Sequence, residues 1–164
     1  MAQIDDRSLD VNEHGVLRIP AELWLSILFL CRHWVLALVV TVSARKSQDS
    51  ALLLGSDFSW VVLAIELPAL FFLALCAQRR PQAGQFVRSL WQYAPWFAHM
   101  TIALHLVHVF WYLEQSSYWL PWPELFLVSC SLIDVAIAYA LIQPGHLRRV
   151  LAEFPAPLSE RQPR

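Results

Sequence analysis

Residues 21–43 read AELWLSILFLCRHWVLALVVTVS, a long apolar stretch that carries Arg32 near its centre. About 20 residues at ~1.5 Å per residue cross the hydrocarbon core of a bilayer. A full charge at that depth costs at least ~2.5–3.5 kcal/mol, so it normally faces protein groups or water rather than lipid. The stretch therefore predicts a membrane-spanning helix that turns Arg32 toward a polar interior.

Three further stretches share this length and apolar character: 59–78, 93–113 and 122–143. Hydrophobic residues make up 57% of the 164-residue chain and charged residues 15%, against ~25% charged residues in ordinary soluble domains. We therefore predict an all-α integral membrane four-helix bundle over residues 21–143. A polar arm, 1–20, precedes the bundle and a polar tail, 144–164, follows it.

Lysine and arginine are unevenly distributed among the polar regions. If the N-terminus is cytoplasmic, nine of these residues lie on the cytoplasmic side: Arg7, Arg18, Arg79, Arg80, Arg88, Arg148, Arg149, Arg161 and Arg164. The opposite side has two, Arg45 and Lys46. Since lysine and arginine concentrate on the cytoplasmic side of membrane proteins, we expect a multi-pass protein with both termini in the cytoplasm.

Several charged or titratable side chains should meet inside this bundle. The helix rise places Arg32, His105 and Asp134 at about the same depth and Glu66 roughly 5 Å nearer the outer face. These residues come from four different predicted helices, and exposing all of them to lipid would be prohibitively costly. We therefore expect a buried polar cluster that contains Arg32, His33, Glu66, His105 and Asp134.

The charges of this cluster do not balance. One fixed positive charge, on Arg32, faces two carboxylates, and a net negative charge in a low-dielectric core is unfavourable. We expect one additional proton, held by Glu66, Asp134 or a histidine. Asp134 is predicted to pair with Arg32, and Glu66 to be partly protonated or bonded to His33 or His105. The cluster could be an ion-pair network that fixes helix packing, or a pathway for protons or ions.

Histidine is concentrated in the third stretch, as His99, His105 and His108, and His33 on the first stretch could face them. Two histidines across a four-helix bundle can hold haem b, and imidazole also suits zinc, copper and iron. The pattern is not specific, because the second and fourth stretches have no histidine. We predict no cofactor, with haem or a metal at these four histidines as alternatives to histidines that bond neighbouring helices.

Pro68 lies near the middle of the second stretch, two residues after Glu66. A proline inside a helix removes a backbone hydrogen bond, here the one to the Ala64 carbonyl, and kinks the helix. We therefore predict a kink beside Glu66. The three cysteines lie inside apolar stretches without a CxxC pattern, which favours buried apolar side chains: Cys31, Cys76 and Cys130.

The stretch NEHGVLRIPAELWLSILFLCRHWVLALV (12–39) resembles the opening of the YfeZ-like family of uncharacterised bacterial inner-membrane proteins. The similar elements are a polar arm ending HGxLxxP and an apolar helix interrupted by Arg32 and His33. The resemblance spans about residues 10–150, with the same four-helix layout. It implies a Gram-negative inner-membrane location and no particular activity. The family-like residues are Pro20, Arg32, His33 and Trp34.

The sequence carries no enzyme signature of the GxSxG, HExxH or phosphate-loop kind, so we expect no catalytic activity. A net charge of −1 without a basic face argues against a nucleic-acid partner. We expect a membrane-embedded accessory or assembly subunit that packs against a larger membrane protein or against copies of itself. The alternatives are a proton- or ion-coupled transport or channel protein that uses Arg32, Glu66 and Asp134, and a haem-binding electron carrier.

Overall fold

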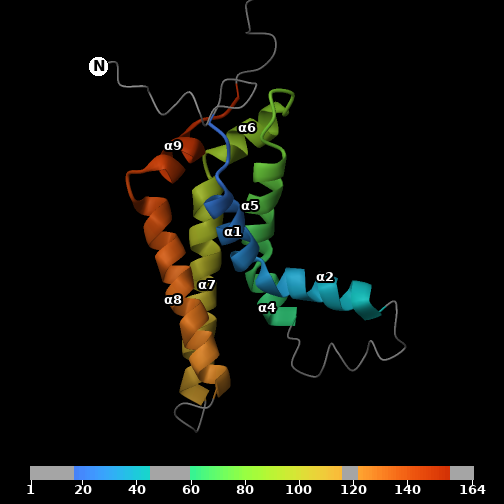
Figure 1. The fold of residues 1–164 in the computed structure, drawn as a ribbon, viewed down its shortest axis with the longest axis vertical. Coiled ribbons are helices and arrows are strands. Elements are labelled where there is room, and N and C mark those ends of the chain that lie inside the picture. Colours follow the sequence, from blue (N-terminus) through green and yellow to red (C-terminus); the bar gives the residue numbers. More distant parts are fainter. Residues whose placement is uncertain (1–16, 45–59, 116–121, 156–164) are drawn as a thin grey trace, which may run out of the picture.

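The computed structural model describes residues 17–44, 60–115 and 122–155, which form helices and no β-strand (Figure 1). The all-α prediction is thereby confirmed. The helices of the described residues are α1 (Ala21–Leu30), α2 (Arg32–Ala44), α4 (Trp60–Ile65), α5 (Leu67–Ala77), α6 (Gln85–Trp91), α7 (Ala94–Gln115), α8 (Trp122–Ile142) and α9 (His146–Ala152).

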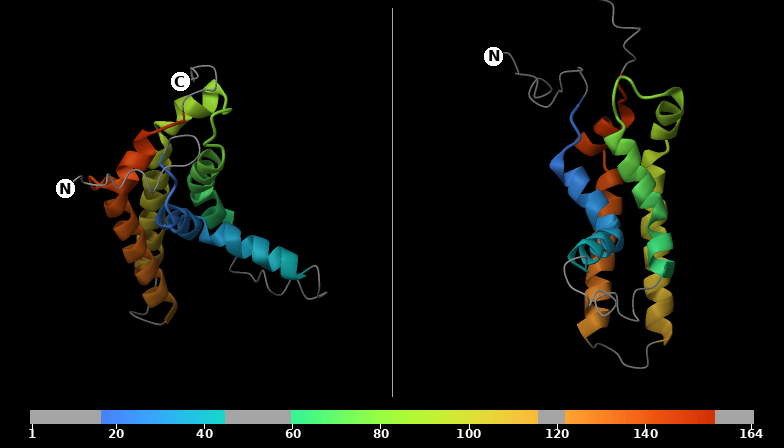
Figure 2. Two further views of the ribbon diagram at one scale, coloured as in Figure 1. Left: turned by 45° about the horizontal axis from the view of Figure 1, so that its top comes forward. Right: turned by 90° about the vertical axis from the view of Figure 1, so that its right-hand side faces the viewer.

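Helix α7 lies at the centre of the packing. Helices α5 and α8 make the most extensive contacts with it, and α1 packs against both α5 and α7. Ala69 on α5 and Ala94 and Ala98 on α7 have no exposed surface, and side chains this small let helix backbones approach closely. Figures 1 and 2 show the short helices α6 and α9 together at one end of this bundle.

Helices α7 and α8 are each long and apolar enough to cross a membrane, and the bent pair α1–α2 would be a third span. The outward faces of α7 and α8 expose large apolar side chains, among them Val107, Phe110, Phe126 and Leu132. Soluble proteins rarely expose many large apolar side chains on neighbouring helices, whereas helices surrounded by lipid do. Among the described residues there are thus two or three candidate spans, whereas the sequence predicted four.

The first apolar stretch is not the single helix predicted over 21–43. Helices α1 and α2 meet at Cys31 with a bend of 77°, and α2 points away from the bundle (Figure 1). The hydropathy of the stretch gives no sign of the bend, because both halves are apolar. At the bend, the Glu66 side chain described below accepts hydrogen bonds from N–H groups at the start of α2.

The second stretch, predicted over 59–78, is interrupted at Glu66 between α4 and α5. Pro68 lies in the first turn of α5, where a missing N–H is tolerated. The interruption therefore lies beside Pro68, where a kink was predicted. It falls on Glu66, the residue that carries the carboxylate. Helix α5 has 11 residues, too few to cross a bilayer by itself.

The third and fourth stretches, predicted over 93–113 and 122–143, appear as α7 and α8 with bounds that differ by at most two residues. The predicted polar tail contains a helix, α9, that the sequence analysis did not foresee. Val150 and Leu151 of α9 are buried, so this helix belongs to the packed structure. Arg45 and Lys46, the two basic residues predicted to lie on the opposite side, fall outside the described residues.

Arg79 joins three segments at the α6–α9 end of the molecule. Its buried guanidinium donates hydrogen bonds to the carbonyls of Leu17 (2.7 Å), Val150 (3.2 Å) and Glu153 (2.9 Å). Because Arg79 follows α5 closely, one side chain fixes the residues before α1, the end of α5 and α9 together. From the sequence, Arg79 was predicted only to lie on the cytoplasmic side, as one of the basic residues.

Replacing Arg79 by alanine should lower the free energy of unfolding by about 2–4 kcal/mol, because three carbonyls lose a charged donor. Thermal unfolding followed by circular dichroism in mild detergent measures this loss. Arg80→Ala is the matched control, since Arg80 is exposed. Equal unfolding temperatures for the two variants would contradict a structural role for Arg79.

Candidate functional site

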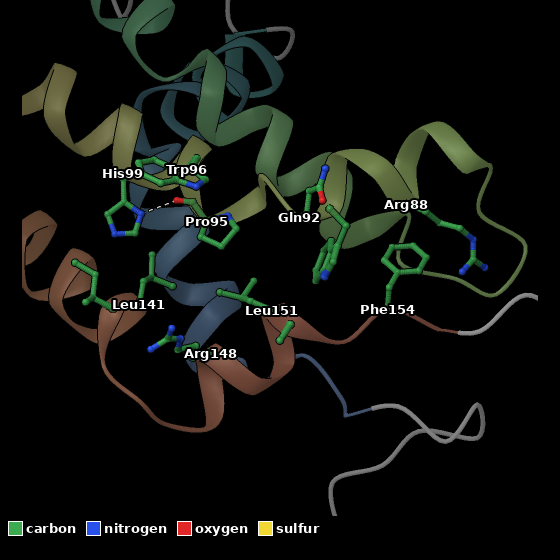
Figure 3. A pocket seen from close by; sticks show the side chains of 12 residues that line it. Arg88, Gln92, Pro95, Trp96, His99, Leu141, Arg148, Leu151 and Phe154 are labelled. Carbon is green, nitrogen blue, oxygen red and sulfur yellow. Dashed lines mark hydrogen bonds between the residues drawn. The ribbon is translucent and has the colours of Figure 1, made fainter.

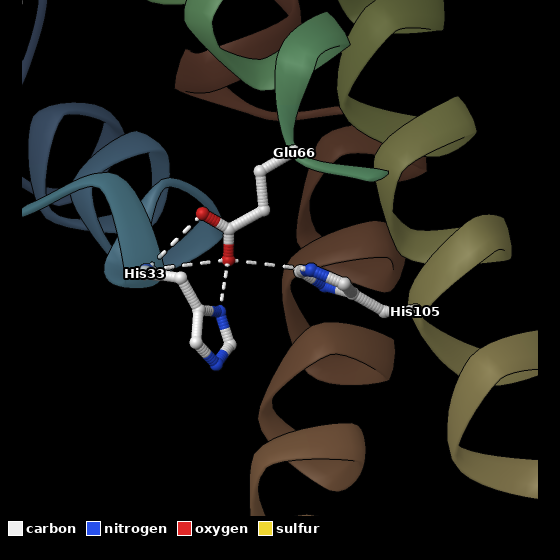
Figure 4. Close-up of side chains that lie close together, drawn as sticks. All are labelled: His33, Glu66 and His105. Atoms are coloured by element: carbon white, nitrogen blue, oxygen red, sulfur yellow. Dashed lines mark hydrogen bonds and ion pairs between the residues drawn. The ribbon is translucent and has the colours of Figure 1, made fainter. Parts of the chain in front are cut away.

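The interruptions of the two apolar stretches meet at one place. Glu66 is the residue between α4 and α5, and it lies against His33 and Trp34 in the first turn of α2, directly after the bend at Cys31. Figure 4 shows the Glu66 side chain reaching from its interruption toward the start of α2. The site is therefore built where the two apolar stretches are interrupted, although Glu66 itself keeps helical hydrogen bonds to Val62 and Leu70.

The Glu66 carboxylate caps α2. Its Oε2 accepts hydrogen bonds from the backbone N–H groups of His33 (3.1 Å) and Trp34 (3.4 Å). The first N–H groups of a helix have no partner within the helix, and the positive end of the helix dipole favours an anion there. In return, the Trp34 indole N–H donates to the Leu63 carbonyl at 2.9 Å, beside the other interruption. Glu66 thus accepts from N–H groups after the first interruption, and Trp34 donates to a carbonyl before the second.

Two histidine rings converge on the second oxygen of the same carboxylate. Glu66 Oε1 lies 2.6 Å from His33 Nδ1 and 3.4 Å from His105 Nε2 (Figure 4). Glu66 has no exposed surface and the His105 side chain is 3% exposed, whereas the His33 side chain is 31% exposed. The site is therefore closed around Glu66 and His105, and His33 is its partly exposed member.

Asp134 on α8 extends the cluster. Its Oδ2 lies 3.2 Å from His105 Nδ1, and its Oδ1 lies 3.3 Å from Arg32 Nη1. The Arg32 guanidinium also lies over the Phe29 ring and bonds the Phe29 carbonyl. The contact of Arg32 with Asp134 is the pairing that the sequence analysis expected.

The contacts form one continuous chain, which runs Arg32, Asp134, His105, Glu66, His33. The five side chains come from α2, α7, α8 and the interruption between α4 and α5. Both carboxylates have no exposed surface, and the cluster contains one guanidinium to balance them. With neutral histidines the cluster has an excess of negative charge, so it favours the uptake of a cation.

The other residues singled out from the sequence lie elsewhere or act indirectly. His99 lines a separate cavity of about 800 Å³ near α6 and α9 (Figure 3), where its Nδ1 lies 2.7 Å from the Pro95 carbonyl oxygen. His108 is half-buried on α7 and takes no part in the chain of contacts described above. Pro68 is buried in the first turn of α5 and supports the interruption that carries Glu66.

The backbone N–H groups that bind Glu66 were not predicted from the sequence. The N–H groups of His33 and Trp34 have no sequence signature of their own, and neither does the indole donor that binds the Leu63 carbonyl. The one signal that could have found them is the polar pair Arg32 and His33 inside an apolar stretch, opposite a glutamate beside a proline.

Replacing Arg32 by methionine should destabilise the protein by about 3 kcal/mol, because Asp134 would remain buried without its cation. Adding Asp134→Leu should recover part of that loss, since the pair is then removed as a whole. Unfolding of both single variants and the double variant in mild detergent measures the coupling. Arg18→Met, at an exposed arginine, is the control, and strictly additive losses would argue against the pair.

Comparison with known protein families matches residues 8–153 of the chain to one family model, described as protein of unknown function (DUF2919). Neither a search of curated proteins nor a search of solved structures found a match. The matched residues include both helix interruptions and all five residues of the cluster. The chain belongs to the DUF2919 family of proteins of unknown function.

Proposed function

We propose that the chain is an integral inner-membrane protein that performs ion-coupled transport, with the cluster around Glu66 as its internal ion site. The membrane assignment is supported by the length and apolar character of α7 and α8 and by the large apolar side chains on their outward faces. The sequence has no GxSxG, HExxH or phosphate-loop motif that would support a catalytic role.

The observation that carries the proposal is the meeting of two interrupted helices at a buried carboxylate. Secondary transporters form their substrate and ion sites from discontinuous helices near the bilayer midplane. Irregular backbone at membrane depth is tolerated only where it is buried in protein or lines a cavity. In this chain Cys31 and Glu66, the residues at the two interruptions, are buried, and titratable groups lie around them.

Charge and exposure favour a cation as the transported or coupling species. Two carboxylates, Glu66 and Asp134, face a single guanidinium, and α2 directs its positive end at one of them. His33 gives the centre a partly exposed side. A cluster that only held helices together would not require a partly exposed imidazole next to a fully buried carboxylate.

The orientation follows the distribution of lysine and arginine, which favours cytoplasmic termini. The inner membrane of a bacterium is the location that the YfeZ-like resemblance implies. In this arrangement α6 and α9, with Arg79, Arg88 and Arg148 nearby, lie on the cytoplasmic side of the bundle.

Liposomes that contain the purified protein and a trapped pH-sensitive dye should lose an imposed proton gradient faster than empty liposomes. Glu66→Gln, which keeps the side-chain size, should slow that loss at least ~10-fold, because a change of more than 1.4 kcal/mol at an ion site has that effect. Glu22→Gln is the control, as Glu22 is exposed on α1. Equal rates for empty liposomes and the wild type would contradict proton-linked transport.

The accessory-subunit role is a second candidate, supported by α2. This helix contacts mainly α1 and α4 and exposes apolar side chains along its length, among them Leu36, Leu38, Val39 and Val42. A helix that the described residues cover so little suits packing against another membrane protein or a second copy. A stoichiometric partner in mild detergent, together with no ion flux, would favour this role over transport.

The haem-binding role fits the geometry less well. His33 and His105 both approach the same Glu66 oxygen, so a porphyrin between them would have to displace a carboxylate that caps α2. Haem ligation would therefore remove the interaction that holds the two interruptions together. An absorbance spectrum of the purified protein without a Soret band would exclude this role.

A further inference from the structure

We infer that His33, Glu66 and His105 form a binding site for a divalent first-row transition-metal ion of the Zn²⁺ type. The inference deepens the proposed function by naming the chemical class of the cation, and it rests on that function for any movement of the ion. The binding itself follows from the placement of three ligand atoms and of the groups behind them.

The three ligand atoms are close enough for one ion. His33 Nδ1, Glu66 Oε1 and His105 Nε2 all lie within 4.8 Å of one another. Zinc bonds of ~2.0–2.2 Å in tetrahedral geometry separate ligand atoms by roughly 3.3–3.5 Å. The 3.4 Å between His105 and Glu66 already fits, while the 2.6 Å between His33 and Glu66 must widen. The widening is under ~1 Å and falls on the imidazole of His33, whose side chain is 31% exposed.

A buried nitrogen with one loose contact faces this space. His105 Nε2 has essentially no exposed surface and makes no hydrogen bond within the described residues, although Glu66 Oε1 is 3.4 Å away. Buried polar atoms are nearly always hydrogen-bonded, so an exception requires an explanation. A metal ion between this nitrogen and Glu66 Oε1 would replace that loose contact with two direct bonds.

Asp134 supplies the supporting contact that metal-binding histidines need. Its Oδ2 lies 3.2 Å from His105 Nδ1, the nitrogen on the far side of the ring from the proposed ion. In metal sites this carboxylate–histidine–metal arrangement fixes the tautomer and orientation of the ring. Arg32 in turn holds Asp134 at 3.3 Å, so the orientation of His105 is set from two further helices.

The ligand types select the class of ion. Two imidazole nitrogens and one carboxylate oxygen suit Zn²⁺, Co²⁺ or Fe²⁺, whereas Ca²⁺ and Mg²⁺ prefer sites made of oxygen alone. Three protein ligands leave a coordination position free, as in zinc sites that exchange a ligand rather than in closed structural sites. An open position suits an ion that enters and leaves, and the exposed side of His33 provides its access route.

Metal binding can be measured on the purified full chain in mild detergent after removal of metals with a chelator. Titration with Co²⁺, followed by visible absorption, should reach one ion per chain, and Zn²⁺ should displace it. His105→Ala and Glu66→Gln should weaken binding more than ~100-fold, and Asp134→Asn about 10–100-fold. His99→Ala, at the histidine in the separate cavity, should bind as the wild type does.

A second variant tests ligation without relying on a loss. In His33→Cys, at the partly exposed position, bound Co²⁺ should show a thiolate-to-metal charge-transfer band that the wild type lacks. Absence of that band in a folded variant that still binds Co²⁺ would overturn the assignment of residue 33. Failure of the wild type to bind Co²⁺ or Zn²⁺, or equal affinity for the His105 and His99 variants, would overturn the site.

The two proposals fail separately. Metal binding in detergent involves no gradient, so a stoichiometric ion without flux in liposomes supports the metal site and contradicts transport. A proton flux that depends on Glu66, without binding of Co²⁺ or Zn²⁺, supports transport and contradicts the metal site.

Discussion

The hydrogen bonds between the Glu66 carboxylate and the first N–H groups of α2 are the interaction on which the rest of the structure depends. They allow the first apolar stretch to stop at Cys31 and turn by 77°, because the N–H groups freed by the turn find an acceptor. They also hold Glu66 at the interruption between α4 and α5, where Trp34 binds the Leu63 carbonyl. In a low-dielectric interior an unpaired backbone group is costly, so neither interruption would be stable alone.

The same contact brings the chemistry of the site together. Once Glu66 is fixed against α2, His33 and His105 reach its second oxygen, and Asp134 and Arg32 complete the chain of contacts behind His105. A buried network of this kind specifies one arrangement of helices when it is fully satisfied and is costly when one member is lost. Its excess of carboxylate over guanidinium and the loose contact between His105 Nε2 and Glu66 are the features that support the proposed ion site.

The sequence predicted the helices and the membership of the cluster better than it predicted their geometry. Helix rise alone brought Arg32, His105 and Asp134 to one depth, and α7 and α8 follow the apolar stretches closely. The bend at Cys31 was not predicted, because the apolar pattern is the same on both sides and the deciding donors are backbone N–H groups. Helix α9 and the contacts of Arg79 were not predicted for a related reason. Arg79 binds backbone carbonyls of residues distant in sequence, one of them in α9, and every residue type has such a carbonyl.

The most direct test of the account is the distance across the bend, measured by electron paramagnetic resonance with spin labels at Glu22→Cys and Ser43→Cys. Both positions are exposed, and the three native cysteines are buried. A bend of 77° separates the two backbone positions by roughly 25 Å, and a straight helix would separate them by about 32 Å at the standard rise. The account predicts the shorter distance in the labelled parent and a shift toward the longer one when Glu66→Leu removes the carboxylate. An unchanged distance in a folded Glu66→Leu variant would contradict the claim that this carboxylate holds the bend.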